Sequence, residues 1–564
     1  MHWTQNYDPL NSPLWSPLIA ALPVVVLLGL LATNRVSAPM AALAGLVTAW
    51  LTAVFVFTPP EASTTGLMPW AGTMLAAALN GAAFGLLPIG WIVLSAIFLY
   101  NLTVETGQFD LVKHSVVSLS GDRRLQALLI AFSFGAFVEG AAGFGTPVAI
   151  SAALLMGAGF KPLQAAGLSL LANTAPVAYG ALGTPIITLA KVTGLDELQL
   201  SAMAGRQLPF FSLLIPAWLV WVMAGWRGVR GVWPALLVCG GSFAAVQFLV
   251  SNYVGPMLVD VAGGLVSLVS LALFLRVWQP RESWRFPDEI ADAAEPTMHA
   301  DPPTRKQLVN AWVPWALLTL FVLLWGLKPV KDTLGTLSLK LEVPHLHQRV
   351  MRTEAVVKKP EREKAEYDLA WLSAPGTGIF LSAVLSAWWL SVGPRRFVAI
   401  LGRSVARLRW PLFTIACMLA IAYTTRYSGI DATLGIAFTR TGWIYPLFAA
   451  LLGWLGVALT GSDTSSNALF GSLQTITADR LVADNVLPLS EGQARILLAA
   501  ANSSGGVMGK MIDAQSIVVA SAATQQAGQE GAILRYVFWH SLILAVLMGL
   551  LVMFQAYVWT KVIP

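Results

Sequence analysis

Long, nearly continuous apolar runs alternate with short polar segments along the whole chain. A bilayer core is crossed by roughly 20 apolar residues in a helix, and apolar runs begin near residues 14, 39, 67, 86, 125, 163, 209, 232, 255, 311, 371, 410, 442, 495 and 536. The runs lack the apolar–polar alternation of a transmembrane β-barrel, and Gly and Pro interrupt several of them. The pattern predicts an all-α polytopic membrane protein with about 12–14 crossings, some of them broken or re-entrant.

Composition narrows the class of protein further. Only 11% of the 564 residues are charged and 56% are hydrophobic, whereas soluble domains carry about 25% charged residues. So few charges cannot cover a water-exposed surface, which excludes a cytosolic enzyme and a nucleic-acid-binding protein. The two cysteines lie far apart inside apolar runs and indicate no disulfide framework.

The basic residues predict how the chain is oriented in the membrane. Five arginines lie within residues 393–409, and two further basic segments surround Arg227 and Arg276. Basic loops stay on the cytoplasmic side, and all three agree on one topology. It divides the chain into an N-terminal half (1–278), a flexible cytoplasmic linker (279–310) and a C-terminal half (311–564) that includes an extracytoplasmic loop, 328–370.

The two halves contain an internal repeat. Residues 170–180 and 499–509 match at a constant offset of 329, with Asn173 corresponding to Asn502 and Gly180 to Gly509. A second Gly-rich segment lies upstream in each half. We therefore predict two broken elements per half, near 135–150 and 170–186 and near 461–471 and 500–520. Duplicated broken helices are typical of secondary transporters, and an odd number of crossings between repeats would invert the second one.

Broken helices inside a membrane indicate a polar site. Unwound backbone is costly in lipid unless it lines a polar cavity, and the N-termini of half-helices favour an anion. Gly and Ser also serve plain helix packing, but the paired polar clusters favour a binding site. We expect the four breaks to converge, with substrate contacted by Thr146, Asn173, Thr174, Ser465, Ser466, Asn467, Asn502, Ser503, Ser504 and Lys510. The glycines predicted to break the helices are Gly140, Gly143, Gly145, Gly180, Gly461, Gly505, Gly506 and Gly509.

Ionisable residues inside apolar segments are candidates for ion coupling. Glu139 and Asp463 lie at matching breaks, and Lys510 and Asp513 are spaced so as to share one helix face. Burial disfavours a charged carboxylate, so we predict proton coupling through Glu139, Asp463 and Asp513. A purely structural ion pair between Lys510 and Asp513 remains an equal alternative. The remaining charges near span ends are interpreted as interfacial: Glu105, Lys191, Asp260 and Asp431.

No enzymatic signature accompanies these features. The sequence has neither an HExxH zinc motif nor a GxxxxGK[ST] phosphate-binding loop. We expect no enzyme activity, no metal and no cofactor, and transport driven by an ion gradient.

Four segments, 135–150, 170–186, 461–471 and 500–520, resemble the lactate permease family of bacterial L-lactate and glycolate permeases. The resemblance implies an ion-transporter-like fold in a multi-pass protein of the bacterial inner membrane. It also implies proton-coupled symport of L-lactate, with D-lactate and glycolate as further substrates. The alternatives are a sodium-coupled carboxylate or dicarboxylate transporter and, as a third, an anion channel. The expected partners are a small monocarboxylate, protons and the lipid bilayer.

Overall fold

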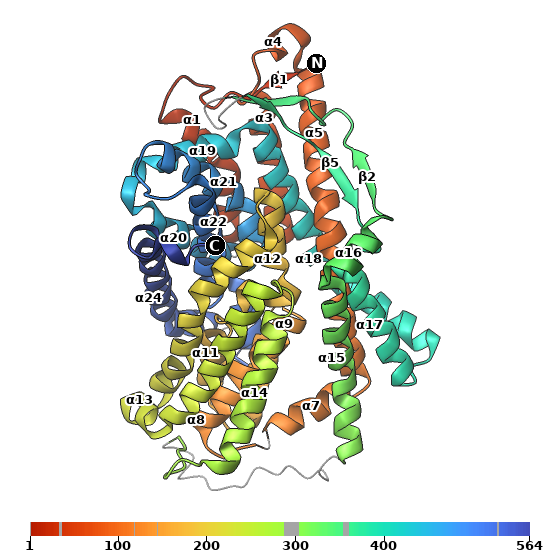
Figure 1. The fold of residues 1–564 in the computed structure, drawn as a ribbon, viewed down its shortest axis with the longest axis vertical. Helices are drawn as coiled ribbons and strands as arrows, with labels where there is room; N and C mark the ends of the chain where they lie inside the picture. The colour runs from red at the N-terminus through yellow and green to blue at the C-terminus, as the bar shows by residue number, and fades with distance from the viewer. Residues whose placement is uncertain are drawn as a thin grey trace.

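A computed structural model describes residues 2–32, 36–117, 119–143, 145–286, 304–353, 360–526 and 529–564. Helices dominate these residues, and the few short strands lie together in the upper part of Figure 1. The predicted all-α membrane architecture is confirmed.

The elements of the N-terminal half alternate long helices with short ones. In chain order they are β1 (Trp3–Thr4), α1 (Trp15–Ala20), α2 (Leu22–Ala32), α3 (Ala38–Phe55), α4 (Ala62–Thr65), α5 (Leu67–Phe84), η1 (Gly85–Gly90), α6 (Trp91–Glu105), α7 (Gln108–Val117), α8 (Arg123–Gln126), η2 (Ala127–Phe134), α9 (Gly135–Ala141), α10 (Thr146–Gly157), α11 (Pro162–Ala172), η3 (Val177–Tyr179), α12 (Gly180–Thr193), α13 (Glu197–Tyr253) and α14 (Val259–Val277).

The C-terminal half adds the remaining strands and a second set of helices. These are α15 (Arg305–Gly326), α16 (Lys328–Gly335), β2 (Leu339–Glu342), β3 (Val350–Arg352), β4 (Glu361–Arg362), β5 (Glu366–Leu369), α17 (Pro375–Trp389), α18 (Pro394–Ser428), α19 (Ile430–Phe438), η5 (Thr439–Ile444), α20 (Tyr445–Thr460), α21 (Asp463–Ala483), α22 (Glu491–Gly509), α23 (Ala514–Ala523), α24 (Glu530–Tyr557) and η6 (Thr560–Val562).

Within the described residues, seven continuous helical stretches are long and apolar enough to cross a membrane, or eight with the bent pair α11–α12. This is fewer than the predicted crossings, partly because α13 contains two and partly because shorter apolar helices such as Pro39–Phe55 and Pro147–Gly157 are not counted. The 57 residues of α13 would reach ~85 Å as a straight helix, but the chain turns near Gly225, whose φ is 64°. Ser212 then donates a hydrogen bond to Gln247 Oε1 at 2.7 Å. The two arms of α13 therefore lie side by side as a helical hairpin.

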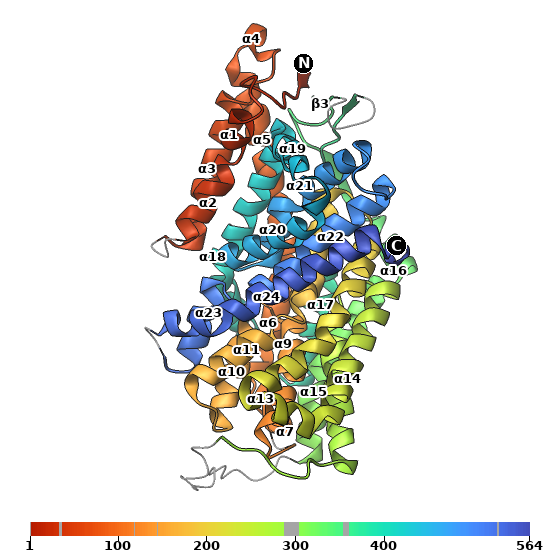
Figure 2. The ribbon, with the colours of Figure 1, turned by 90° about the vertical axis from the view of Figure 1, so that its left-hand side faces the viewer.

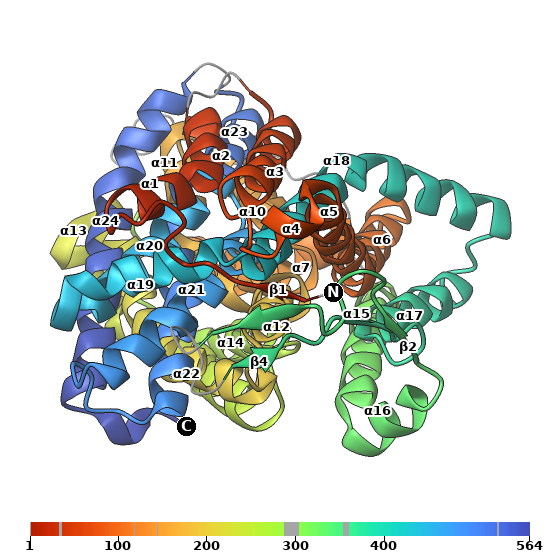
Figure 3. The same cartoon turned by 90° about the horizontal axis from the view of Figure 1, so that it is seen from above.

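The helices form two packed groups. In one group α20 packs on α22 and α24, α21 packs on α12 and α22, and α13 packs on α14. Figure 2 shows α20, α22 and α24 crossing the molecule beside the helices that the N-terminal half of the chain contributes to this group. In the other, α5 and α3 pack on α18, and α6 and α15 pack on α17. Figure 3 shows α6, α15 and α17 well separated from α11, α13 and α24. Each group draws helices from both halves of the sequence, so the halves interleave.

The predicted extracytoplasmic loop, 328–370, is structured where it is described. It contributes α16 and the four strands β2 to β5, with β1 of the N-terminus parallel to β3. The buried carboxylate of Glu363 forms an ion pair with Arg352, with Nε 2.7 Å from Oε1, and accepts a hydrogen bond from Arg426 Nε at 3.3 Å. Arg426 also donates to the backbone carbonyl of Val192 at 3.1 Å. The loop is therefore joined both to α18 and to the last turn of α12.

Most of the predicted cytoplasmic linker, residues 287–303, lies outside the described residues. The described part before it packs on the protein, since the backbone N–H of Trp284 donates to Asp122 Oδ2 at 2.9 Å. The part after it belongs to the first turns of α15.

Three of the glycines predicted to break a helix have a different structural role. Gly140 lies inside α9, and Gly505 and Gly506 lie inside α22, which continues without a break to Gly509. A Cβ on Gly505 would lie 2.1 Å from the backbone carbonyl oxygen of Ala450. The glycine therefore lets α20 and α22 pack backbone against backbone, as small residues do in membrane helix pairs.

We expect Gly505→Ala to destabilise the protein, because the added methyl group must push α20 and α22 apart. Overpacking of this kind costs about 1–3 kcal/mol, so the midpoint of thermal unfolding in detergent should fall. Gly492→Ala is the matched control, because it lies in the first turn of the same helix and its Cβ would meet no atom within 4 Å. Equal midpoints for the two variants would contradict close packing at Gly505.

Candidate functional site

Four helix breaks meet around one small cavity. They lie between α9 and α10, between α11 and α12, between α20 and α21, and between α22 and α23. The cavity has a volume of about 30 Å³ and is lined by Glu139, Gly143, Val177, Gly180, Ala181, Thr184, Pro185, Gly461, Ser462, Asp463, Thr464 and Lys510. The structure thus brings the four predicted segments together, two from each half of the chain.

Two helix N-termini at the cavity favour a negative charge. It lies at the N-terminus of α21, where the side chain of Ser462 accepts from the backbone N–H of Ser465 at 3.3 Å. It also lies at the start of α12, whose residues 181–183 have positive φ before the helix proceeds from Thr184. Helix N-termini present free N–H groups and a positive partial charge. Two such termini facing one cavity suit a carboxylate.

Lys510 adds a full positive charge to the cavity. Its buried Nζ donates to the backbone carbonyl of Gly461 at 2.6 Å and lies 3.3 Å from Asp513 Oδ2. Asp513 Oδ1 accepts from the backbone N–H of Ser516 at 2.7 Å at the start of α23. Asp513 does not line the cavity. The structure therefore shows the ion pair, with the lysine facing the cavity and the aspartate behind it.

Asp463 is held by side chains of α21 and α22. Its Oδ2 accepts from Ser503 Oγ at 2.5 Å and from Asn467 Nδ2 at 3.3 Å. Its buried Oδ1 has no hydrogen-bond partner in the part of the chain that the structure describes. A Cβ on Gly506 would lie 2.4 Å from that oxygen, so this glycine makes room for the carboxylate.

Glu139 lines the same cavity from the end of α9. It is buried, and its Oε2 lacks a hydrogen-bond partner among the described residues. A Cβ on Gly180 would lie 2.3 Å from its Oε1. Asn173 lies beside Glu139 and is buried too, and neither polar atom of its amide is hydrogen-bonded within the described chain. The cavity therefore has a carboxylate with unsatisfied acceptor capacity on each side.

The other predicted substrate residues lie behind the cavity lining. Asn502 donates to Asn467 Oδ1 at 2.9 Å and accepts from Gln474 Nε2 at 3.2 Å. Thr174 donates to the carbonyl of Leu171, and Ser466 to that of Gly453. The side chain of Thr146 lies outside the described part of the structure. Among the predicted residues whose side chains are described, those that do not line the cavity are Asn173, Thr174, Ser465, Ser466, Asn467, Asn502, Ser503 and Ser504.

The matched asparagines occupy different kinds of position. Asn173 is the C-cap of α11 and belongs to a break, whereas Asn502 lies inside α22, about two turns before its end. The motif match finds both elements but does not align them structurally.

The sequence does contain a signal that would have identified two of the missed lining residues. The tripeptide Gly-Thr-Pro occurs at 145–147 and again at 183–185, and the second copy supplies Thr184 and Pro185.

The interfacial interpretation is wrong for two of the four charged residues to which it was applied. Asp260 is completely buried, and Asp431 is buried with Ser472 Oγ donating to its Oδ2 at 2.6 Å. Both follow Gly-containing turns that resemble span ends, but other helices cover those turns. Lys191 is exposed, and Glu105 is half-buried in an ion pair with Arg403, as expected.

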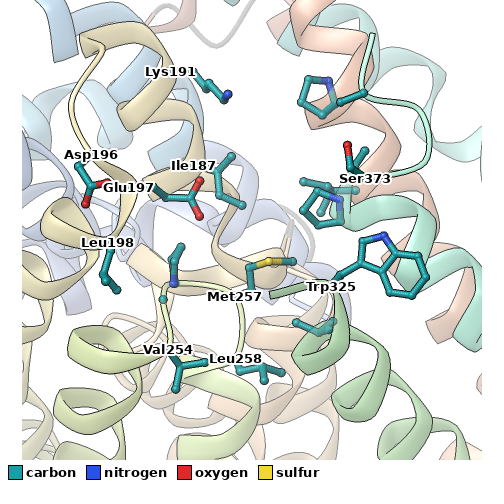
Figure 4. A pocket seen from close by; sticks show the side chains of 18 of the residues that line it. Ile187, Lys191, Asp196, Glu197, Leu198, Val254, Met257, Leu258, Trp325 and Ser373 are labelled. Atoms are coloured by element: carbon teal, nitrogen blue, oxygen red, sulfur yellow. The ribbon is translucent and has the colours of Figure 1, made fainter. Parts of the chain in front are cut away.

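A larger cleft lies at the other end of α12. It has a volume of about 350 Å³ and is shown in Figure 4. Lys191, Asp196 and Glu197 lie along one wall, Trp325 and Ser373 lie opposite, and residues 254–258 contribute the loop between α13 and α14. Ile187, one turn beyond Thr184 on α12, also lines it. The cleft and the small cavity therefore share α12.

The fold and the cavity define a multi-pass membrane protein of the transporter class. The sequence profile of L-lactate permeases matches residues 16–559, so the chain belongs to the L-lactate permease family, whose members are transporters and not enzymes. It is 46% identical to glycolate permease GlcA of Escherichia coli K12 over 99% of both chains. It is 44% identical to the L-lactate permease of Bacillus subtilis and 42% to that of E. coli K12, each over 100% of both chains. Among solved structures, the YdaH transporter of Alcanivorax borkumensis matches 90% of this chain and 97% of its own, at 13% identity and a TM-score of 0.46.

Proposed function

We propose that the protein carries lactate and glycolate across the bacterial inner membrane together with protons. The observation that supports this most directly is the meeting of Lys510 with the N-termini of α12 and α21 at one buried cavity. A substrate carboxylate there accepts hydrogen bonds from free backbone N–H groups and from the ammonium group. The relatives named for L-lactate and glycolate supply the substrate class.

The size of the cavity implies a carrier that changes conformation. A cavity of about 30 Å³ is enough for bound water but small for a whole lactate. Substrate binding therefore requires α12 and α21 to separate, because both line the cavity and pack on each other. Movement of broken elements around a central site is the usual basis of alternating access.

Proton coupling follows from the carboxylates on both sides of the site. A lactate anion placed between ionised Glu139 and Asp463 meets two like charges in a buried environment, which is unfavourable. Protonation of either carboxylate removes part of this repulsion, so anion binding and proton binding favour each other. The substrate and its proton then cross as a nearly neutral pair.

Uptake by purified protein in liposomes tests the proposal. With an acidic exterior we expect radiolabelled lactate and glycolate to accumulate inside, succinate to be excluded, and a proton uncoupler to abolish accumulation. A sodium gradient imposed at equal pH inside and outside should drive no accumulation of these substrates. Sodium-driven uptake of succinate would instead indicate a dicarboxylate carrier, and equilibration without accumulation would indicate a channel.

A further inference from the structure

A further buried carboxylate lies beside the helix that carries Glu139. Asp260, in the first turn of α14, is completely buried, and neither of its carboxylate oxygens has a hydrogen-bond partner among the residues that the structure describes. The chain brings it against α9 at Gly140, where an added Cβ would lie 2.7 Å from both Asp260 Cβ and the backbone nitrogen of Val261. Gly140 follows Glu139 directly. The glycine thus serves close contact between α9 and α14, beside the glutamate that lines the cavity.

The charges around Asp260 do not neutralise it. The titratable groups that face it are Glu139 from α9 and Tyr179 from η3. The Tyr179 hydroxyl donates elsewhere, to the backbone carbonyl of Ser201 at 2.7 Å. Lys510 and Asp513 act on Glu139 from the cavity side. Two buried carboxylates with unsatisfied oxygens repel each other when both are ionised, so the pair is suited to sharing a proton.

The large cleft reaches the loop that leads into α14. Figure 4 shows this loop, which supplies Val254, Gly255, Pro256, Met257 and Leu258 to the cleft, and Asp260 is the second residue of the helix that follows. The charged residues lining the cleft are three acids, Asp196, Glu197 and Asp368, and one base, Lys191. A wall with excess negative charge attracts cations and repels a carboxylate substrate. Asp368 comes from the loop that the arginine pattern places outside the cell.

We propose that Asp260 and Glu139 form a two-carboxylate proton site, in which Asp260 takes up a proton from the cleft and exchanges it with Glu139 at the cavity. In the exchange the O–H bond of Asp260 breaks as the O–H bond of Glu139 forms, and water relays the proton because neither oxygen of Asp260 is hydrogen-bonded within the described residues. A hydronium ion in the cleft then gives a proton to Asp260 and leaves as water. Protons and substrate therefore reach the site by different routes. This inference rests on the proposed proton symport and assigns its proton pathway.

The test compares two activities of Asp260→Asn in liposomes. The amide mimics a permanently protonated acid, so exchange of labelled for unlabelled lactate at equal pH should stay within about twofold of the wild type. Accumulation driven by an acidic exterior, and lactate-driven proton uptake measured with an internal pH dye, should fall at least tenfold. Asp484→Asn, an exposed residue at the end of α21, is the control and should change neither activity.

The results distinguish a failure of this inference from a failure of the proposed symport. Asp260→Asn with wild-type accumulation overturns the inference, and so does a folded variant that loses exchange and accumulation in parallel, because that pattern indicates a structural role. Gel filtration checks that the variant is folded. If Asp260→Asn does not elute as a single species, Asp260→Ser replaces it, with the same expected results. A wild type that exchanges lactate but moves no protons refutes the proposed symport itself, whatever the variants do.

Discussion

Asp463→Asn should reduce proton-driven lactate accumulation at least tenfold while leaving the protein folded. The variant keeps the size of the side chain, and its amide oxygen still accepts from Ser503 and Asn467. It removes the negative charge that would make proton binding and anion binding depend on each other. The measurement is the ratio of internal to external labelled lactate in liposomes under an imposed pH gradient. Glu139→Gln should behave in the same way, because it lines the opposite side of the cavity.

Two controls separate charge from packing in this experiment. Asp484→Asn removes an exposed carboxylate at the end of the same helix and should accumulate lactate normally. Ser503→Ala removes one hydrogen bond to Asp463 but keeps the carboxylate, so accumulation should persist at a reduced rate. If Glu139→Gln and Asp463→Asn both retain normal accumulation, the proton is carried by other groups.

Removing the charge of Lys510 should weaken substrate binding more than it slows transport. Lys510→Met keeps most of the aliphatic stem and loses the ammonium group that faces the cavity. A hydrogen bond to a charged group contributes about 1.5–3 kcal/mol, which corresponds to roughly a tenfold to hundredfold rise in KM for lactate. Initial rates of uptake over a range of lactate concentrations would give the KM of the wild type and of the variant.

The ion pair with Asp513 requires a second variant in that experiment. Lys510→Met leaves a buried carboxylate without its partner, which alone destabilises a protein by several kcal/mol. The double variant Lys510→Met/Asp513→Asn removes that charge, so thermal stability should recover while KM stays high. Recovery of a wild-type KM in the double variant would show that Lys510 serves only to neutralise Asp513.

The sequence was sufficient to predict the helical class and the location of the breaks, because both depend on local composition. Gly461 illustrates this: it adopts a φ of 73° at the end of α20, where its neighbours are polar and the preceding run is apolar. The family resemblance, carried by the same four segments, is likewise confirmed.

The predictions that were wrong concern residues whose roles depend on contacts between distant segments. Gly505 looks like a helix breaker, yet the carbonyl of Ala450 on another helix explains why a glycine is there. Asn502 resembles Asn173 in its local sequence but is held inside a helix by Asn467 and Gln474 of α21. Asp260 follows a turn and looks interfacial, whereas α9 and its neighbours cover it. Periodicity and motif spacing carry no information about such tertiary neighbours.

The hydrogen bond from Arg426 to Val192 links the energetics of the site to the loop 328–370. Val192 lies in the last turn of α12, the helix whose first turn lines the cavity, and Arg426 is paired with Glu363 of that loop. If α12 moves relative to α18, this hydrogen bond must break. The free energy of opening the site then includes the loss of a hydrogen bond from a charged group that does not line the cavity. The energetics of opening therefore depend partly on residues outside the site.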